Sequence, residues 1–260
     1  MWKYCILVCI SICFTFSNPS KRSADRDVAP CLRKFYNAVY NESYNCTIGL
    51  DFSYKNFTAG KSCFLEVVKH ECTPTQYDEL DSEFDYFVEI LTSEPSDDNC
   101  DNPYYQYHGQ QCMALLDYVG IKNKELYPME TKINDSRVLD VIRKCEEVEE
   151  CIKPVCISTD TVKSVISGAC EKLRMKNSEF MTCQFELDRI PIEKMNVTCL
   201  QDFDFFANTL SSEIEKFSTK KECTREIMEK NCGKKAVEKF DYYSDLMLKV
   251  LETARDDEED

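Results

Sequence analysis

The stretch "CTREIMEKNCGKKAVEKFDYY", from Cys223 to Tyr243, decides the fold because the chain contains a second version of it. That version is "CFLEVVKHECTPTQYDELDSEFDYF", from Cys63 to Phe87. Both place eight residues between two cysteines and continue to an aromatic block that begins Phe-Asp-Tyr. The residues before the first cysteine also match, since "NFTAGKSC" in one version corresponds to "KFSTKKEC" in the other.

Two further cysteines precede each version at nearly the same spacing, Cys31 with Cys46 and Cys183 with Cys199. Four cysteines in the same order before the same aromatic block are hard to obtain by chance, so the sequence predicts an internal duplication. We expect a signal peptide at 1–17, a first cysteine-rich helical domain at 18–128, a second at 129–250 and an acidic tail at 251–260.

Apolar residues follow the period of a helix in both versions. The positions are Leu80, Phe84, Phe87, Val88 and Leu91 in the first, and Ala236, Phe240, Tyr243, Met247 and Leu251 in the second. This spacing is typical of the buried face of an amphipathic helix. Strand-like alternation is nowhere sustained. The sequence therefore predicts an all-α fold, with two disulfide-stapled helical domains that arise from the repeat.

The segments between the paired cysteines are also predicted to be helical. On a straight helix, positions nine residues apart lie about 13.5 Å apart and on opposite sides. A disulfide needs Cα atoms within about 7 Å. We therefore expect no bond between Cys63 and Cys72, and none between Cys223 and Cys232.

The sequence predicts several further element boundaries. Capping boxes are expected at Ser212 with Glu215 and at Thr219 with Glu222, a helix end at Gly233, helices at 138–152 and at 161–167 before Gly168, and an irregular segment at 92–111.

The first residues resemble a secretory signal peptide. Lys3 is followed by an apolar run from Tyr4 to about Phe16 and then by small and polar residues, which places cleavage near Ser17. A membrane anchor is the alternative, but the run is shorter than the roughly 18 to 20 residues that span a bilayer. We expect a secreted, extracellular protein without a membrane span.

Fourteen cysteines follow the signal peptide, an even number that indicates a disulfide framework in a secreted chain. They are Cys31, Cys46, Cys63, Cys72, Cys100, Cys112, Cys145, Cys151, Cys156, Cys170, Cys183, Cys199, Cys223 and Cys232. Zinc binding is the weaker alternative, because no two cysteines are in CxxC spacing. Counting does not determine the pairing, nor whether Cys100 and Cys112 belong to the first or the second domain.

Charge and sequons agree with this class of protein. The net charge of −15 is spread over both halves, which argues against nucleic acid and anionic membrane surfaces as partners. The five N-glycosylation sequons begin at Asn41, Asn45, Asn56, Asn134 and Asn196.

The second half resembles a known family. The order of Cys145, Cys151, Cys156, Cys170, Cys183, Cys199, Cys223 and Cys232, followed by an aromatic helix, is similar to the nematode secreted cysteine-rich family called domain of unknown function 19. The resemblance covers nearly all of residues 140–250 and is looser over 31–92, which resemble a truncated copy. It implies that these cysteines are structural, and it supplies no catalytic residue.

The sequence gives little indication of catalysis. Nucleophilic catalysis needs a base beside the nucleophile, and the two histidines, His70 and His108, read as ordinary surface or packing residues. We expect no enzyme activity, no cofactor and no bound metal. The favoured hypothesis is an interaction module that binds an extracellular protein or matrix. The alternative is an extracellular carrier of a lipid or small hydrophobic ligand.

Overall fold

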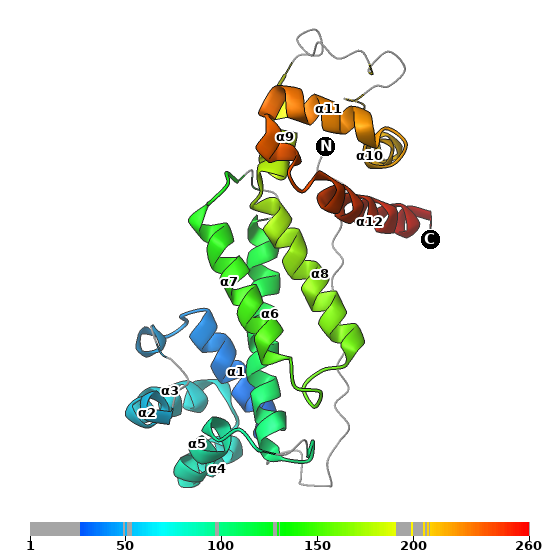
Figure 1. Cartoon of the computed structure of the whole chain (residues 1–260). Helices are drawn as coiled ribbons and strands as arrows, with labels where there is room; N and C mark the ends of the chain where they lie inside the picture. Colours follow the sequence, from blue (N-terminus) through cyan, green and yellow to red (C-terminus); the bar gives the residue numbers. More distant parts are fainter. Residues whose placement is uncertain are drawn as a thin grey trace. The chain divides into compact units, whose positions relative to one another are not determined.

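The computed structural model describes residues 27–48, 50, 54–96, 99–126, 129, 131–190, 199, 205, 207 and 209–259; the predicted signal peptide lies outside them. This part of the chain is helical and has no strand, so the all-α prediction is confirmed (Figure 1). Its α-helices are α1 (Ala29–Tyr40), α2 (Tyr54–Ala59), α3 (Lys61–Glu71), α4 (Pro74–Ser82), α5 (Phe84–Thr92), α6 (Pro103–Leu126), α7 (Ser136–Cys151), α8 (Asp160–Lys176), α9 (Glu179–Leu187), α10 (Leu210–Phe217), α11 (Lys221–Cys232) and α12 (Phe240–Glu259). Two short 3-10 helices are η2 (Asn45–Thr47) and η5 (Lys234–Val237).

The described residues form two compact units. Residues 27–124 and 143–170 form the N-terminal unit, and residues 125–142 and 171–259 form the C-terminal unit. Each unit encloses a hydrophobic core of its own. Each core is built around one version of the repeated sequence.

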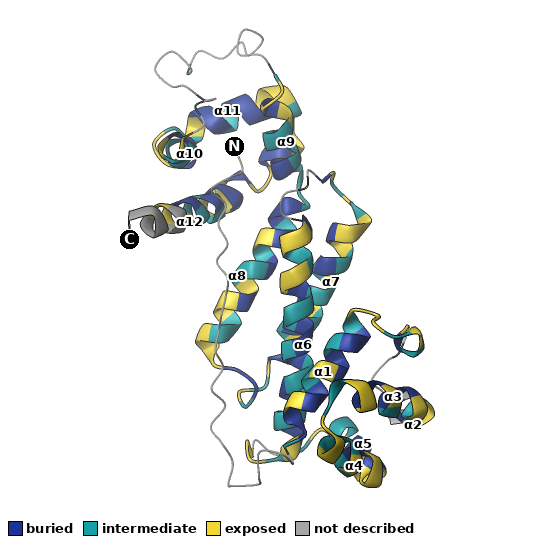
Figure 2. Ribbon diagram, turned by 180° about the vertical axis from the view of Figure 1, so that it is seen from behind, coloured by how far each residue is buried: buried dark blue, intermediate teal, exposed yellow. Residues whose placement is uncertain are grey.

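Aromatic rings fill the core of the N-terminal unit. The ring of Phe64 lies 4.7 Å from that of Phe35, 5.5 Å from that of Phe84 and 5.6 Å from that of Phe87, measured between centroids. These rings come from α3, α1 and α5. Four of the five predicted stripe residues are buried and Leu91 is partly buried, so the predicted helical face is confirmed (Figure 2).

The core of the C-terminal unit is built in the same way. Phe180 of α9 lies 5.9 Å from Phe240 of α12 and 6.1 Å from Phe217 of α10 between ring centroids. All five predicted stripe residues from Ala236 to Leu251 are buried. Helix α12 continues to Glu259 and so includes most of the segment predicted as an acidic tail.

Equivalent positions of the two versions are buried alike. Val67 and Val68 follow the first cysteine of α3 at the same distance as Ile227 and Met228 follow that of α11. All four side chains are fully buried. The repeated sequence therefore builds the same buried helix twice, from different apolar residues.

The capping box predicted from Thr219 and Glu222 is wrong. Helix α11 begins at Lys221, and Lys220 at its N-cap makes no side-chain capping bond. The reason lies in the preceding turn, where the Lys220 N–H donates to the Glu215 carbonyl at 2.9 Å and closes the end of α10. Thr219 is part of that turn rather than a cap.

The capping box predicted from Ser212 and Glu215 is displaced by one turn. Thr209 is the N-cap of α10, and its hydroxyl accepts from the Ser212 N–H at 3.1 Å.

The helix end predicted at Gly233, after α11, is confirmed. Its φ of 87° is a left-handed conformation that favours glycine.

Gly168 does not end a helix, contrary to the prediction. Helix α8 continues through it to Lys176. The reason is that Ile166, just before this glycine, and Cys170 and Leu173, just after it, are all buried in the helical conformation. A glycine inside a helix costs about 1 kcal/mol relative to alanine. Burial of three apolar residues outweighs that cost.

The predicted irregular segment at 92–111 is also too long, because α6 begins at Pro103. Proline is well suited to the first turn of a helix. The Asn102 side chain accepts from the Tyr104 N–H at 2.9 Å, as an N-cap does. His108 therefore lies on a helix and not in a loop.

Candidate functional site

The two versions of the repeat have the same disulfide pattern. The outer bonds join Cys31 to Cys72 and Cys183 to Cys232, and the inner bonds join Cys46 to Cys63 and Cys199 to Cys223. Each outer bond connects the helix that precedes the repeated stretch, α1 or α9, to the end of the helix between the C-x8-C cysteines, α3 or α11. Neither C-x8-C pair is bonded internally, so that prediction is confirmed. Helices α3 and α11 are therefore each bonded near both ends, to a different segment of the chain at each end.

The other six cysteines form a second group. The bonds are Cys100–Cys156, Cys112–Cys151 and Cys145–Cys170. Cys100 and Cys112 thus pair with cysteines that come later in the chain and not with those of the first repeat. The predicted disulfide framework is confirmed, and all six cysteines of this second group lie in the N-terminal unit.

His108 lies against one of these bonds. Its Nε2 is 3.6 Å from Sγ of Cys151, and its ring stacks on that of Tyr104 with centroids 5.2 Å apart. Burial lowers the pKa of His108 below its usual value, which favours the neutral imidazole. One ring nitrogen of His108 and the Sγ atoms of Cys112 and Cys151 all lie within 4.8 Å of one another. Both sulfurs are part of a disulfide here, so neither is a thiolate.

Sequence reasoning missed this cluster for two reasons. The sequence predicts an irregular segment at His108, and Cys151 is 43 residues away in the sequence. The spacing of His108 and Cys112, four residues apart, was the available signal, because such residues share one face of a helix.

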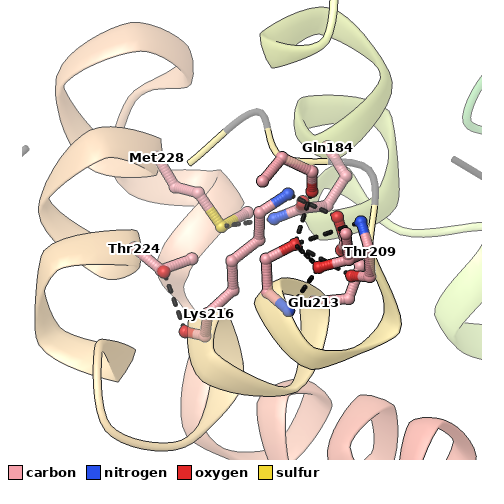
Figure 3. A network of polar contacts seen from close by, with 8 residues as sticks. Gln184, Thr209, Glu213, Lys216, Thr224 and Met228 are labelled. Atoms are coloured by element: carbon pink, nitrogen blue, oxygen red, sulfur yellow. Dashed lines mark hydrogen bonds and ion pairs between the residues drawn. The ribbon is translucent and has the colours of Figure 1, made fainter. Parts of the chain in front are cut away.

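A polar network lies in the C-terminal unit around Lys216, which is 1% exposed (Figure 3). Its ammonium is 2.6 Å from the Glu213 carboxylate and lies over the ring of Phe205, 4.6 Å from the centroid. The Thr224 hydroxyl donates to the Lys216 carbonyl at 2.8 Å. These contacts join α10 to α11. Because the ammonium is paired, the network serves packing.

His70 lies at the surface, at the end of α3. Its ring stacks on that of Tyr44 with centroids 6.1 Å apart, and the Tyr44 hydroxyl donates to the neighbouring Glu71 at 2.8 Å. These contacts hold the segment before η2 against α3. They give His70 a packing role.

Exposed tyrosines occupy equivalent positions in the two units. Tyr86 is 61% exposed and Tyr242 is 50% exposed, each two residues after the buried phenylalanine of its Phe-Asp-Tyr block. The Tyr242 hydroxyl donates to the Glu171 carboxylate at 2.6 Å. This hydrogen bond raises the pKa of Tyr242 to about 12. The block therefore directs its first residue into the core and its third to the solvent.

Three of the five sequons have a described asparagine side chain, at Asn41, Asn45 and Asn134, and all three are exposed. Asn196 and the side chain of Asn56 lie outside the described part of the chain. Within that part, every helix is too short or too polar to cross a bilayer.

A family model described as "Domain of unknown function (DUF19)" matches the chain twice, over residues 22–101 and 100–254. The two matches fall on the two versions of the repeat. No curated protein and no solved structure matches the chain.

Proposed function

The chain belongs to the DUF19 family, and from that premise we propose that it is a secreted glycoprotein that binds another extracellular protein or matrix without catalysing a reaction. The apolar signal-like start, seven disulfides and exposed sequons support secretion. We also propose that the chain is of nematode origin and that its first repeat is a truncated copy. The resemblance found in the sequence supports both points.

The observation that best supports a binding role is the pair of exposed tyrosines. Tyr86 and Tyr242 are at the starts of α5 and α12, next to an exposed aspartate in each case. Tyrosine is enriched at binding interfaces because it offers a large, rigid contact surface and a polar tip. The duplication has changed most residues of the repeat, yet both versions present this side chain to solvent.

Disulfides would make such a surface rigid before it binds. Tyr86 begins a helix whose Phe84 packs on α3, which is held by two disulfides, and Tyr242 begins a helix whose Phe240 packs on α9, which is held by the Cys183–Cys232 bond. A contact surface that is already ordered pays less conformational entropy on association. This arrangement suits a binding module, and the contacts of His70 are those of a packing residue.

The test begins with protein secreted from eukaryotic cells and trimmed of glycans. Its native mass should be that of the bare chain with seven disulfides. An additional mass that leaves on denaturation would favour the carrier alternative. The wild type and the Tyr86→Ala and Tyr242→Ala variants would then be tested for binding to extracellular matrix and cell surfaces.

We expect one or both tyrosine variants to bind about tenfold more weakly, the effect of losing a residue worth more than about 1 kcal/mol. Val155→Ala is the matched control, because Val155 is 81% exposed and lies outside both repeats. Equal binding by the wild type and all three variants would refute the proposed surface.

A further inference from the structure

The strongest unassigned group in the described chain is the His108 cluster, formed by His108, Cys112 and Cys151. His108 and Cys112 project from the same face of α6, and Cys151 is the last residue of α7. All three belong to the N-terminal unit. A ring nitrogen of His108 and the two Sγ atoms lie within 4.8 Å of one another, and Nε2 is 3.6 Å from Sγ of Cys151.

The imidazole of His108 is held in place by its neighbours. It stacks on the buried Tyr104 with an interplanar angle of 12°, and the Gln111 side chain is a hydrogen-bond partner of the ring. Nε2 is thereby directed at the sulfur of Cys151. Contacts that fix the ring are also usual around a metal-binding histidine.

The distance between His108 and Cys151 matches that between two ligands of a tetrahedral zinc ion, whereas the sulfurs of Cys112 and Cys151, 2.02 Å apart in their disulfide, must separate before both can bind. Bonds of about 2.3 Å to sulfur and about 2.0 Å to nitrogen place the two ligand atoms roughly 3.6 Å apart. Nε2 of His108 and Sγ of Cys151 are 3.6 Å apart. The Cα atoms of Cys112 and Cys151 are 5.6 Å apart, so rotation of the two side chains can separate the sulfurs once their bond is broken.

We propose that the dithiol form of the Cys112–Cys151 pair, together with His108, binds a divalent cation of the zinc type. The three protein ligands leave one tetrahedral position for water or an external ligand. Oxidised, the same atoms form a structural disulfide. The chain contains the dithiol form whenever this bond has been reduced or has not yet formed.

The step that opens the site is a thiol–disulfide exchange. A thiolate of a dithiol reductant attacks Sγ of Cys151, which is partly exposed, and Sγ of the buried Cys112 leaves and takes a proton. The second thiol of the reductant then releases Cys151 and closes the reductant's own disulfide. Two electrons and two protons have passed to the protein. The cation displaces both thiol protons when it binds.

The test uses the full oxidised chain, reduced in steps with a water-soluble phosphine, which is converted to the phosphine oxide. After removal of the phosphine, samples with and without Zn²⁺ are alkylated, and the modified cysteines are mapped by mass spectrometry. Far-UV circular dichroism follows the helices at each step. The variants are His108→Ala and, as the matched control, His70→Ala, which changes the other histidine of the chain.

We expect Zn²⁺ to slow alkylation of Cys112 and Cys151 about tenfold or more in the wild type and in His70→Ala, but not in His108→Ala. Equal protection in His108→Ala, or no protection in any protein, would overturn the proposal. So would a Cys112–Cys151 bond that opens only after the helical signal has been lost, since the cluster would then not exist as a folded site.

Discussion

Replacing Phe84 with alanine should destabilise the N-terminal unit far more than replacing Tyr86, although the two residues are nearly adjacent. Phe84 is 1% exposed and packs on Phe64, whereas Tyr86 is 61% exposed. Phe240→Ala makes the equivalent change in the C-terminal unit, where Phe240 is also 1% exposed.

The magnitude follows from the buried area. A phenylalanine that buries about 150 Å² of side chain contributes roughly 4 kcal/mol at about 25 cal/mol per Å². This value lies within the 3–5 kcal/mol typical of Phe→Ala in a core. The Lys61 ammonium lies 4.6 Å from the centroid of the Phe84 ring, which adds about 0.5–1 kcal/mol in the N-terminal unit. Phe84→Ala should therefore cost slightly more than Phe240→Ala.

Urea unfolding followed by far-UV circular dichroism, with all disulfides oxidised, measures these free energies. Tyr86→Ala is the control and should change the free energy of unfolding by no more than about 0.5 kcal/mol. If Tyr86→Ala cost as much as Phe84→Ala, or if Phe84→Ala left the midpoint unchanged, the inferred orientation of the Phe-Asp-Tyr block would be incorrect.

Three further changes test other parts of the structure. Removing the inner bond of the second repeat, by replacing Cys199 and Cys223 with alanine, should cost about 3 kcal/mol in the same urea assay, because the bond closes a loop of 24 residues; a loss below about 1 kcal/mol would contradict this. Glu171→Gln should return the pKa of Tyr242 from about 12 towards 10.0 in a spectrophotometric titration. Because the folded state holds this phenolic proton more tightly, the wild type gains stability from it below pH 10 and loses that gain as the pH rises towards 12, whereas the variant should show no such loss. Thr73→Ala should lower stability by about 1 kcal/mol, because the Thr73 hydroxyl caps α4; an unchanged urea midpoint would argue against the cap.

The helical core could be predicted from the sequence because it depends on local periodicity. The stripes through Phe84 and Phe240 and the absence of a Cys63–Cys72 bond both follow from helix geometry alone. Helix ends were harder to predict. At Gly168, burial of the residues in the flanking turns outweighs the low helix propensity of glycine. At Thr219, the residue belongs to the turn that ends α10 and so does not cap α11.

The pairing of the cysteines could not be predicted, because it depends on contacts between distant segments. Cys112 and Cys151 are 39 residues apart, and Cys100 and Cys156 are 56 apart. Nothing in the local sequence distinguishes those partners from the other cysteines. The burial of Lys216 was missed for a similar reason, since the ring of Phe205 that covers it comes from outside α10.

The disulfides divide the chain into three covalently closed blocks, at residues 31–72, 100–170 and 183–232. A protease that cuts once inside any block releases nothing until the protein is reduced, because a disulfide bridges the cut. After a single cut at 73–99 or at 171–182, no disulfide joins the two pieces. Resistance to extracellular proteases is therefore unevenly distributed, because one cleavage in either connecting segment breaks the last covalent link between neighbouring blocks.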